Sequence, residues 1–247
     1  MQKKEVIILE NITKTFEIQD KRSNTIKDWL KDSLFNRGEK KILKALKNIN
    51  LSIYEGETFG IIGGNGSGKS TLTKIMSGVY LPDEGGKVTK KGKSMLMSLN
   101  VGMSPELTAR QNIYVIGSAL GLKIKEIDAK VDDIIAFAEL EKYKDTVIRH
   151  FSNGMKQRLS FATAINAGAD IIFLDEVFAV GDQKFKNNAI KILEENWLNH
   201  RTVVMVSHSL ENIRKYCDRA IYIKNGEMVY LGDPGIAIDM YRKESSN

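Results

Sequence analysis

Apolar runs and amphipathic stretches alternate along this chain, and their order predicts an α/β fold. Short, β-branched apolar runs predict strands at Val6–Leu9, Ile49–Ile53, Thr58–Ile62, Met95–Leu99, Ile171–Leu174, Thr202–Val206, Ala220–Ile223 and Met228–Leu231. Stretches with a helical period predict helices at Ser70–Gly78, Gln111–Leu120, Ile124–Ala138, Met155–Ala167, Phe185–Trp197, Ser209–Tyr216 and Ile236–Tyr241. Asn225-Gly226 between the last two strands is typical of a tight hairpin turn. The pattern indicates an α/β core with a helical insertion in the middle of the chain.

The segment Asp20–Lys44 differs from the rest of the chain because it is polar and rich in lysine. Its apolar residues recur on one face of a short amphipathic helix; they are Ile26, Trp29, Leu30, Leu34 and Phe35. Two interpretations stand side by side. The helix lies at the cytosolic surface of a bilayer, where lysine and aromatic side chains suit the interface, or it packs on its own domain.

Composition narrows the class of protein. The chain has 247 residues, of which 42% are hydrophobic and 28% charged, so it can bury a folded core. Its single cysteine, Cys217, excludes a disulfide-stapled scaffold. No apolar run approaches the roughly 18 residues of a membrane span, and the N-terminus lacks a signal-peptide pattern. We therefore expect a cytosolic chain without a pore. The net charge of +6 mildly favours anionic neighbours.

A glycine-rich segment follows the third predicted strand and precedes a helix. It reads Gly63-Gly64-Asn65-Gly66-Ser67-Gly68-Lys69-Ser70-Thr71 and matches G-x-x-x-x-G-K-[ST]. The backbone N–H groups of such a loop surround phosphate oxygens, and the helix N-terminus adds positive charge. We expect Lys69 to reach the β- and γ-phosphates, Ser70 to ligate Mg²⁺ and Thr71 to add a phosphate contact. A glycine-rich turn that arose by chance is the alternative.

Two acidic residues end the apolar strand Ile171–Leu174. Asp175 is placed to complete the Mg²⁺ shell opposite Ser70, and Glu176 to act as general base on an attacking water. An acidic turn without a catalytic role is the alternative. His208 ends the next strand, at the edge where α/β sheets bind ligands, which favours a γ-phosphate contact over a structural role.

A second glycine-containing segment, Ser152-Asn153-Gly154-Met155, opens a predicted helix. A hydroxyl, a bare backbone and a helix N-terminus together suit a phosphate, and Ser152 or Asn153 is also an ordinary helix cap. Both interpretations can hold. With the other motifs in this order, the segment resembles the LSGGQ signature of ATP-binding-cassette (ABC) ATPases, with Asn153 at its first glycine and Met155 at its glutamine.

This resemblance covers essentially the whole chain and implies an ABC-type P-loop NTPase. The implied fold is a single nucleotide-binding domain over residues 1–247, with a RecA-like core, an antiparallel β subdomain and a helical subdomain at about 100–168. ATP and Mg²⁺ are the implied ligands. A head-to-tail homodimer is also implied, in which the signature of one subunit closes on the ATP of the other, and Ala179–Asp182 would be the D-loop, with Asp182 beside the site.

Several runs look more closely like the ATPases of cell-surface polysaccharide exporters. They are Asp175–Asp182, Pro105–Ile113 and Asn153–Met155. The similarity implies a subunit at the cytoplasmic face of the inner membrane that couples ATP hydrolysis to export of lipid-linked O-antigen, capsule or teichoic acid. Its partners would be a second copy and two polytopic permease subunits.

Other ABC functions remain as alternatives. One is the ATPase of another ABC transporter, either a lipid or drug exporter or an importer, and the Asp175–Asp182 run and the Asp20–Lys44 insertion argue against the importer. The other is a soluble ABC ATPase that acts on nucleic acid or ribosomes. Such proteins usually carry a long coiled-coil insertion or two cassettes, and this chain has neither, so no nucleic-acid partner is expected.

The chain departs from the ABC pattern at two positions. Asn100 stands where most members have a glutamine that contacts Mg²⁺, and its shorter amide is a candidate ligand. Phe16 is the candidate adenine-stacking aromatic, with a core phenylalanine as the alternative. A permease-docking groove is expected near Asn100–Asn112, unless its apolar residues pack on the neighbouring helix instead; these residues are Leu99, Val101, Met103 and Leu107.

Overall fold

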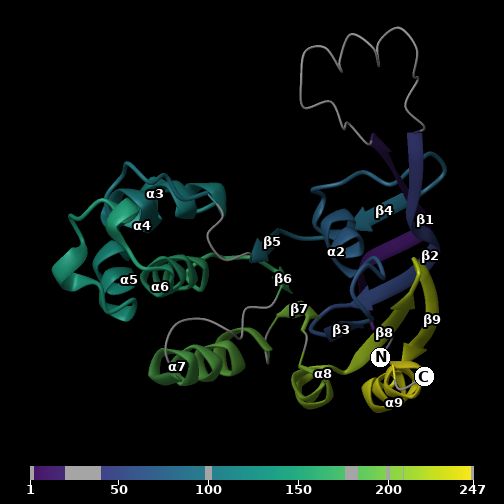
Figure 1. Cartoon of the computed structure of the whole chain (residues 1–247). Helices are drawn as coiled ribbons and strands as arrows, with labels where there is room; N and C mark the ends of the chain where they lie inside the picture. The colour runs from purple at the N-terminus through teal and green to yellow at the C-terminus, as the bar shows by residue number, and fades with distance from the viewer. Residues whose placement is uncertain are drawn as a thin grey trace, which may run out of the picture.

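The computed structural model describes residues 3–19, 40–97, 102–175, 183–198, 201–207 and 209–245. Figure 1 shows two sheets beside a separate group of helices. The three-stranded sheet is antiparallel and has the order β2-β1-β4, with β1 at Glu5–Gln19, β2 at Lys40–Tyr54 and β4 at Lys87–Lys90.

The six-stranded sheet has the order β5-β6-β7-β3-β8-β9. Its strands are β3 (Thr58–Ile62), β5 (Ser94–Met97), β6 (Ile171–Asp175), β7 (Thr202–Val206), β8 (Arg219–Lys224) and β9 (Glu227–Gly232). All neighbours pair in parallel except β8 and β9, which form the hairpin expected around Asn225-Gly226. Every residue of β3 and β7 is buried, as expected for strands covered on both faces. The α/β prediction is confirmed.

The helices lie close to their expected places. They are α2 (Lys69–Ser77), α3 (Ala109–Ala119), α4 (Ile124–Asp128), α5 (Val131–Phe137), α6 (Asn153–Ala164), α7 (Gln183–Leu193), α8 (Leu210–Tyr216) and α9 (Pro234–Ser245), with the short turns η1 (Glu141–Tyr143), η2 (Ile148–His150) and η4 (Glu194–Leu198). The single helix predicted at Ile124–Ala138 is wrong. The helix is interrupted between Asp128 and Val131. This interruption lets α4 and α5 bury Ile127 and Val131 in one cluster.

The two long strands β1 and β2 correct the expected extent of the insertion. They run on past the sheet as a paired hairpin, with Phe16 opposite Leu43 and Gln19 opposite Lys40. Residues 40–44, expected within the insertion, therefore belong to a strand. The amphipathic helix predicted at Ile26–Phe35 lies outside the described residues. Strand β4 is not predicted from the sequence, because Val88 is the one apolar residue of its Lys-Val-Thr-Lys run.

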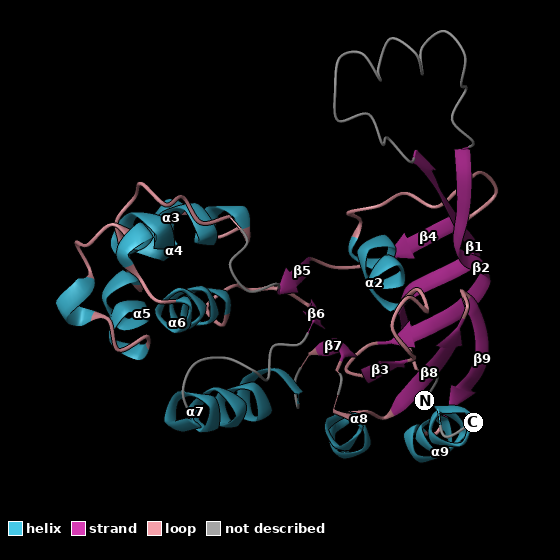
Figure 2. Ribbon diagram, in the orientation of Figure 1, coloured by secondary structure: helices cyan, strands magenta, loops and turns pink. Residues whose placement is uncertain are grey.

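Hydrophobic clusters cover both faces of the parallel sheet. One cluster joins the sheet to α2 and to the antiparallel sheet through residues such as Phe59, Leu72 and Ile49. The other includes Phe161 of α6 and Phe185 of α7. Helices α3 to α6 also bury a cluster of their own between them, and Figure 2 shows them gathered beyond β5, away from the antiparallel sheet.

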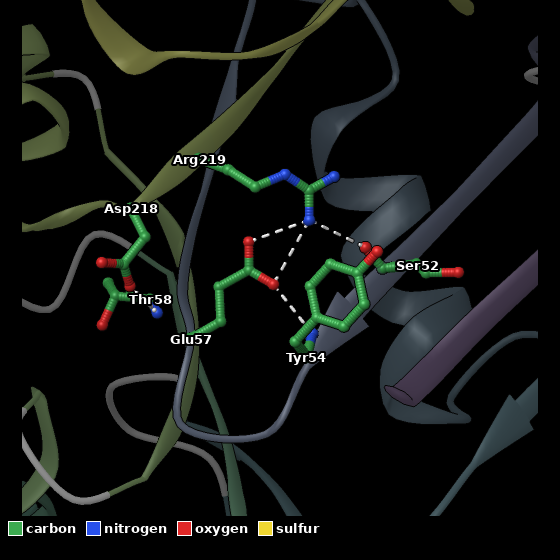
Figure 3. Close-up of polar contacts among 6 residues, drawn as sticks. All are labelled: Ser52, Tyr54, Glu57, Thr58, Asp218 and Arg219. Carbon is green, nitrogen blue, oxygen red and sulfur yellow. Dashed lines mark hydrogen bonds and ion pairs between the residues drawn. The ribbon is translucent and has the colours of Figure 1, made fainter. Parts of the chain in front are cut away.

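A buried ion pair fixes the end of β3 that lies away from the glycine-rich loop. The side chain of Glu57 is 2% exposed, and its carboxylate accepts a 3.0 Å hydrogen bond from Nη1 of Arg219. The same carboxylate accepts a bond from the backbone N–H of Tyr54, and Arg219 also donates to the carbonyl of Ser52. Figure 3 shows these groups converging. The contacts tie the β2–β3 turn to the start of β8.

Candidate active site

A cavity of about 920 Å³ opens between the hairpin of β1 and β2 and the start of α2. It is lined by Phe16, Ile42, Leu43, Lys44, Ala45, Lys47, Asn65, Gly66, Ser67, Gly68, Lys69, Ser70, Thr71, Val206 and Asn225. The predicted loop residues 65–71 and Phe16 therefore meet at one cavity. Gly63 precedes it at the end of β3.

Two glycines of the loop are required by close approaches of the backbone. A Cβ atom on Gly63 would lie 2.4 Å from the carbonyl oxygen of Ile223. Gly68 has a φ of +111°, and a Cβ atom there would lie 2.6 Å from the carbonyl oxygen of Ala45. Any larger residue would push the loop away from β8 or β2. The glycines thus hold the loop against the strands beside it.

The loop presents hydrogen-bond donors to the cavity. Helix α2 begins after Gly68 without a side-chain cap, so its first N–H groups face the loop. Nζ of Lys69 donates to the carbonyl oxygens of Gly63 and Gly64, each at 2.8 Å. Oγ of Ser67 is buried and has no hydrogen-bond partner among the described residues. An uncapped helix end and an ammonium group beside it fit the oxygens of a phosphate group.

The turn between β8 and β9 holds the phosphate loop from the side, which the sequence does not reveal. The N–H of Gly226 donates to the carbonyl of Ser67 at 3.0 Å, and the N–H of Lys47 donates to the carbonyl of Gly226 at 2.8 Å. Nζ of Lys47 also pairs with Glu227 at 3.0 Å. The hairpin motif Asn225-Gly226 was a signal for the turn. Ser67, its hydrogen-bond partner in the loop, is 159 residues away in the chain, and no local sequence pattern indicates this contact.

Phe16 is half-buried at the cavity wall rather than enclosed in the core. Its ring meets Tyr80 edge-on at 5.7 Å between centroids, and Nζ of Lys14 lies 5.8 Å from its centroid. The paired strand adds Ile42 and Leu43, which are 62% and 50% exposed. The sequence analysis does not predict these two residues at the cavity, because it places them in the polar Asp20–Lys44 insertion.

The predicted metal ligands are described in part. Ser70 lines the cavity, and Asp175 ends β6 in register with Val206, which also lines it. Within the described ranges, no group of three or more His, Cys, Asp or Glu could by itself hold a metal ion. Mg²⁺ in phosphate sites commonly takes one or two protein oxygens and completes its shell with phosphate and water. A hydroxyl and a carboxylate fit that chemistry. Asn100, Glu176, Asp182, His208 and the Ala179–Asp182 loop lie outside the described residues.

The signature segment forms a helix cap away from this cavity. Oγ of Ser152 accepts a 3.2 Å bond from the N–H of Met155, and α6 starts at Asn153. The capping interpretation is therefore correct as local geometry. A Cβ atom on Gly154 would meet only Oγ of Ser152, at 3.8 Å, so its surface is open. None of these residues lines the cavity around the phosphate loop of the same chain.

Residues 46–179 match the family described as ABC transporter. The chain belongs to this family. Solved ABC structures share its fold. A dimeric post-hydrolysis state of the ATP-binding cassette MJ0796 bound to ADP and Pi aligns with a TM-score of 0.70 and 26% identity, over 92% of this chain and 98% of that one. An ATP-binding subunit of an ABC transporter aligns with a TM-score of 0.73 and 18% identity, over 98% and 100%. The predicted P-loop NTPase fold is confirmed.

Curated relatives carry export names. The O-antigen export system ATP-binding protein RfbB of Myxococcus xanthus is 36% identical over 98% of this chain and 56% of its own length. The teichoic acids export ATP-binding protein TagH of Enterococcus faecalis is 36% identical over 98% and 53%. RfbB of Klebsiella pneumoniae is 33% identical over 96% and 98%. This ABC chain thus spans about half of the first two relatives and nearly all of the third.

A smaller groove of about 320 Å³ lies between β5 and the helices α3 and α6. Met97, Gly102, Ile116 and Leu120 line it, with Val79, which is 57% exposed, at its edge. Of the residues expected to line a docking groove, Met103 instead packs against the cluster within α3 to α6. Leu107 is also absent from the lining, and Leu99 and Val101 lie outside the described residues.

None of the helices in the described ranges has the length and apolarity to cross a membrane.

Proposed function

We propose that this chain is the ATP-binding subunit of an ABC exporter, which couples ATP binding and hydrolysis to export of a lipid-linked cell-surface polysaccharide. The observation that carries the nucleotide part is the donor set of the phosphate loop, namely Lys69 and the open end of α2 at one cavity. The export names of relatives matched over nearly the whole chain support the transport part.

Each residue of the site has a distinct task in this proposal. When a triphosphate binds, Lys69 exchanges the carbonyls of Gly63 and Gly64 for the β- and γ-phosphate oxygens. Ser70 and Asp175 would hold Mg²⁺, with Asn100 as a further candidate ligand. The bound ion would neutralise part of the charge on the phosphates. Glu176 removes a proton from the attacking water.

Three further contacts complete the proposed nucleotide site. His208 contacts the γ-phosphate at the end of β7. Backbone groups of the loop form the phosphate cradle, and Thr71 lies at its end. The loop residues are Gly63, Asn65, Gly66 and Gly68. Phe16 stacks on the adenine, and its place on the cavity wall supports this role over that of a core residue.

The complete site requires two copies of the chain. We propose a head-to-tail homodimer, in which Ser152, Asn153, Gly154 and Met155 of one subunit close on the ATP of the other, with Asp182 beside them. Two observations support it. The signature residues do not line the cavity of their own chain, and the related cassette MJ0796 is dimeric. The open surface at Gly154 leaves room for a phosphate from the partner.

The membrane partner is a pair of polytopic permease subunits. The apolar groove beside β5, with Val79 at its edge, suits a short helix from such a partner. In this arrangement the chain is a single nucleotide-binding domain, its helical subdomain spans about residues 100–168, and it sits at the cytoplasmic face of the inner membrane.

Co-purification tests this function. The chain is expected to copurify with a polytopic membrane protein encoded beside it, and the complex should hydrolyse ATP. A deletion strain should accumulate lipid-linked glycan inside the cell. A complex that hydrolyses ATP in a strain whose surface glycan is unchanged would instead indicate another class of ABC transporter.

A further inference from the structure

Three phenylalanines join helices that come from distant parts of the chain. Phe137 ends α5, Phe161 lies in the last turn of α6 and Phe185 lies in the first turn of α7. Their ring centroids are 5.5 to 6.2 Å apart in all three pairs. Phe161 and Phe185 are buried. Such clusters resist sliding of one helix past another, because the rings fill one another's gaps.

Arg158 closes this cluster on its solvent side. Its guanidinium carbon lies 5.8 Å from the ring centroid of Phe185, and its Nη1 pairs with Glu139 at 3.0 Å. The side chain of Arg158 is 16% exposed and that of Glu139 is 44% exposed, so water screens the ion pair more than it screens the contact with Phe185. Glu139 follows α5 with a φ of +56°, a conformation uncommon for a residue with a side chain. One arginine thus connects α5, α6 and α7.

The Arg158 contact joins two helices that each begin beside a segment of the proposed nucleotide site. Helix α6 starts at the signature segment, and Arg158 lies about 9 Å along the helix from Ser152. Helix α7 starts at Gln183, directly after residues 176–182 in the chain. Those residues include the proposed general base, Glu176. The Arg158 contact therefore links the segment offered to the partner's nucleotide with the segment that serves the chain's own nucleotide.

We propose that Arg158 is a positioning residue for ATP hydrolysis, which acts by holding α7 in register with the signature helix α6. The inference rests on the proposed function. Hydrolysis in a composite site needs both segments placed at once, since a misplacement of about 1 Å can lower a rate by two orders of magnitude. ATP binding by the monomer does not need this register, because neither Arg158 nor Phe185 lines the nucleotide cavity.

The substitution Arg158→Met in the full chain tests the proposal, since it keeps an unbranched side chain and removes the charge. We expect kcat to fall roughly 5- to 30-fold, as the summed loss of a cation–π contact and a partly exposed ion pair predicts. KM and the ATP affinity of the monomer should stay within about twofold of wild type. The matched control is Arg149→Met, which removes an exposed pair with Glu106 on the same group of helices and should leave kcat unchanged.

A double-mutant cycle on kcat separates positioning from general stability. If Arg158 acts through Phe185, adding Phe185→Leu to Arg158→Met should cost little more than the larger single change. Additive losses would overturn the proposal, as would an Arg158→Met protein with wild-type kcat or one whose ATP affinity falls together with kcat. If Lys69→Ala retained hydrolysis, the proposed function itself would fail. If only Arg158→Met behaves as wild type, this inference alone fails.

Discussion

The backbone N–H of Gly226 donates a 3.0 Å hydrogen bond to the carbonyl oxygen of Ser67, in the middle of the phosphate loop. The φ of Gly226 is +81°, and a Cβ atom there would lie 2.8 Å from the carbonyl oxygen of Ala45. The turn between β8 and β9 is therefore wedged between β2 and the loop. This contact therefore holds the loop in place through a residue that is not part of the loop.

Gly226→Ala should weaken ATP binding. The added methyl group must push the turn away from Ala45 and so move its N–H away from Ser67. We expect the Kd for ATP to rise about tenfold, which corresponds to roughly 1.4 kcal/mol, when it is measured by titration of the purified chain. Gly121→Ala is the control, because Gly121 has a similar φ of +86° with nothing within 4 Å. Equal effects of the two changes would show that backbone strain alone is responsible.

Lys69→Ala should abolish ATP hydrolysis. The ammonium group, which lies 2.8 Å from the carbonyls of Gly63 and Gly64, is the charged donor that we propose for the β- and γ-phosphates. Loss of such a charge costs about 10²-fold or more in kcat, measured by phosphate release. Lys74→Ala, one turn further along α2, removes a charge that lies over the ring of Tyr80 instead. It should keep more than half of the activity, and a comparable loss there would point to general charge rather than to phosphate contact.

Gly154→Asp should stop hydrolysis and spare both folding and ATP binding by the monomer. The site has room for a side chain, and a carboxylate in the first turn of α6 favours the helix by about 0.3–1 kcal/mol. The same charge repels the partner's phosphates in the composite site. Gly168→Asp, at an exposed position with nothing within 4 Å, is the matched control. Loss of monomer binding in Gly154→Asp would contradict a contact made between subunits.

Arg219→Met should destabilise the fold without changing the chemistry of the site. It leaves the carboxylate of Glu57, which is 2% exposed, without its cation. Breaking a buried pair in this way costs about 3–5 kcal/mol, which is measurable by urea unfolding. Lys4→Met removes an exposed pair with Glu55 and should cost less than about 1 kcal/mol. Similar losses in the two variants would mean that the Glu57 pair is effectively solvated.

The sequence predicted the parallel core and the phosphate loop, because each depends on residues close together in the chain. Apolar runs such as Thr202–Val206 determine buried strands, and the spacing from Gly63 to Thr71 determines the loop. Features that depend on distant partners were missed. Strand β4 is mostly polar and forms by pairing with the edge of β1. Ile42 and Leu43 reach the cavity wall because the pairing of β1 with β2 continues beyond the part of β1 that pairs with β4. The sequence also leaves open whether Met103 lines a docking groove or packs on the neighbouring helix, and the structure places it, half-buried, against the cluster within α3 to α6.

ATP-driven dimerisation of a Glu176→Gln variant tests the central claim most directly. Without the proposed general base, ATP binds but is not hydrolysed, so the two signature segments should remain closed on two nucleotides. Light scattering with ATP and Mg²⁺ should then report a stable dimer that disappears with ADP, while Lys69→Ala in the same background stays monomeric. A Glu176→Gln protein that remains monomeric at saturating ATP, where the wild-type chain turns over, would contradict the account.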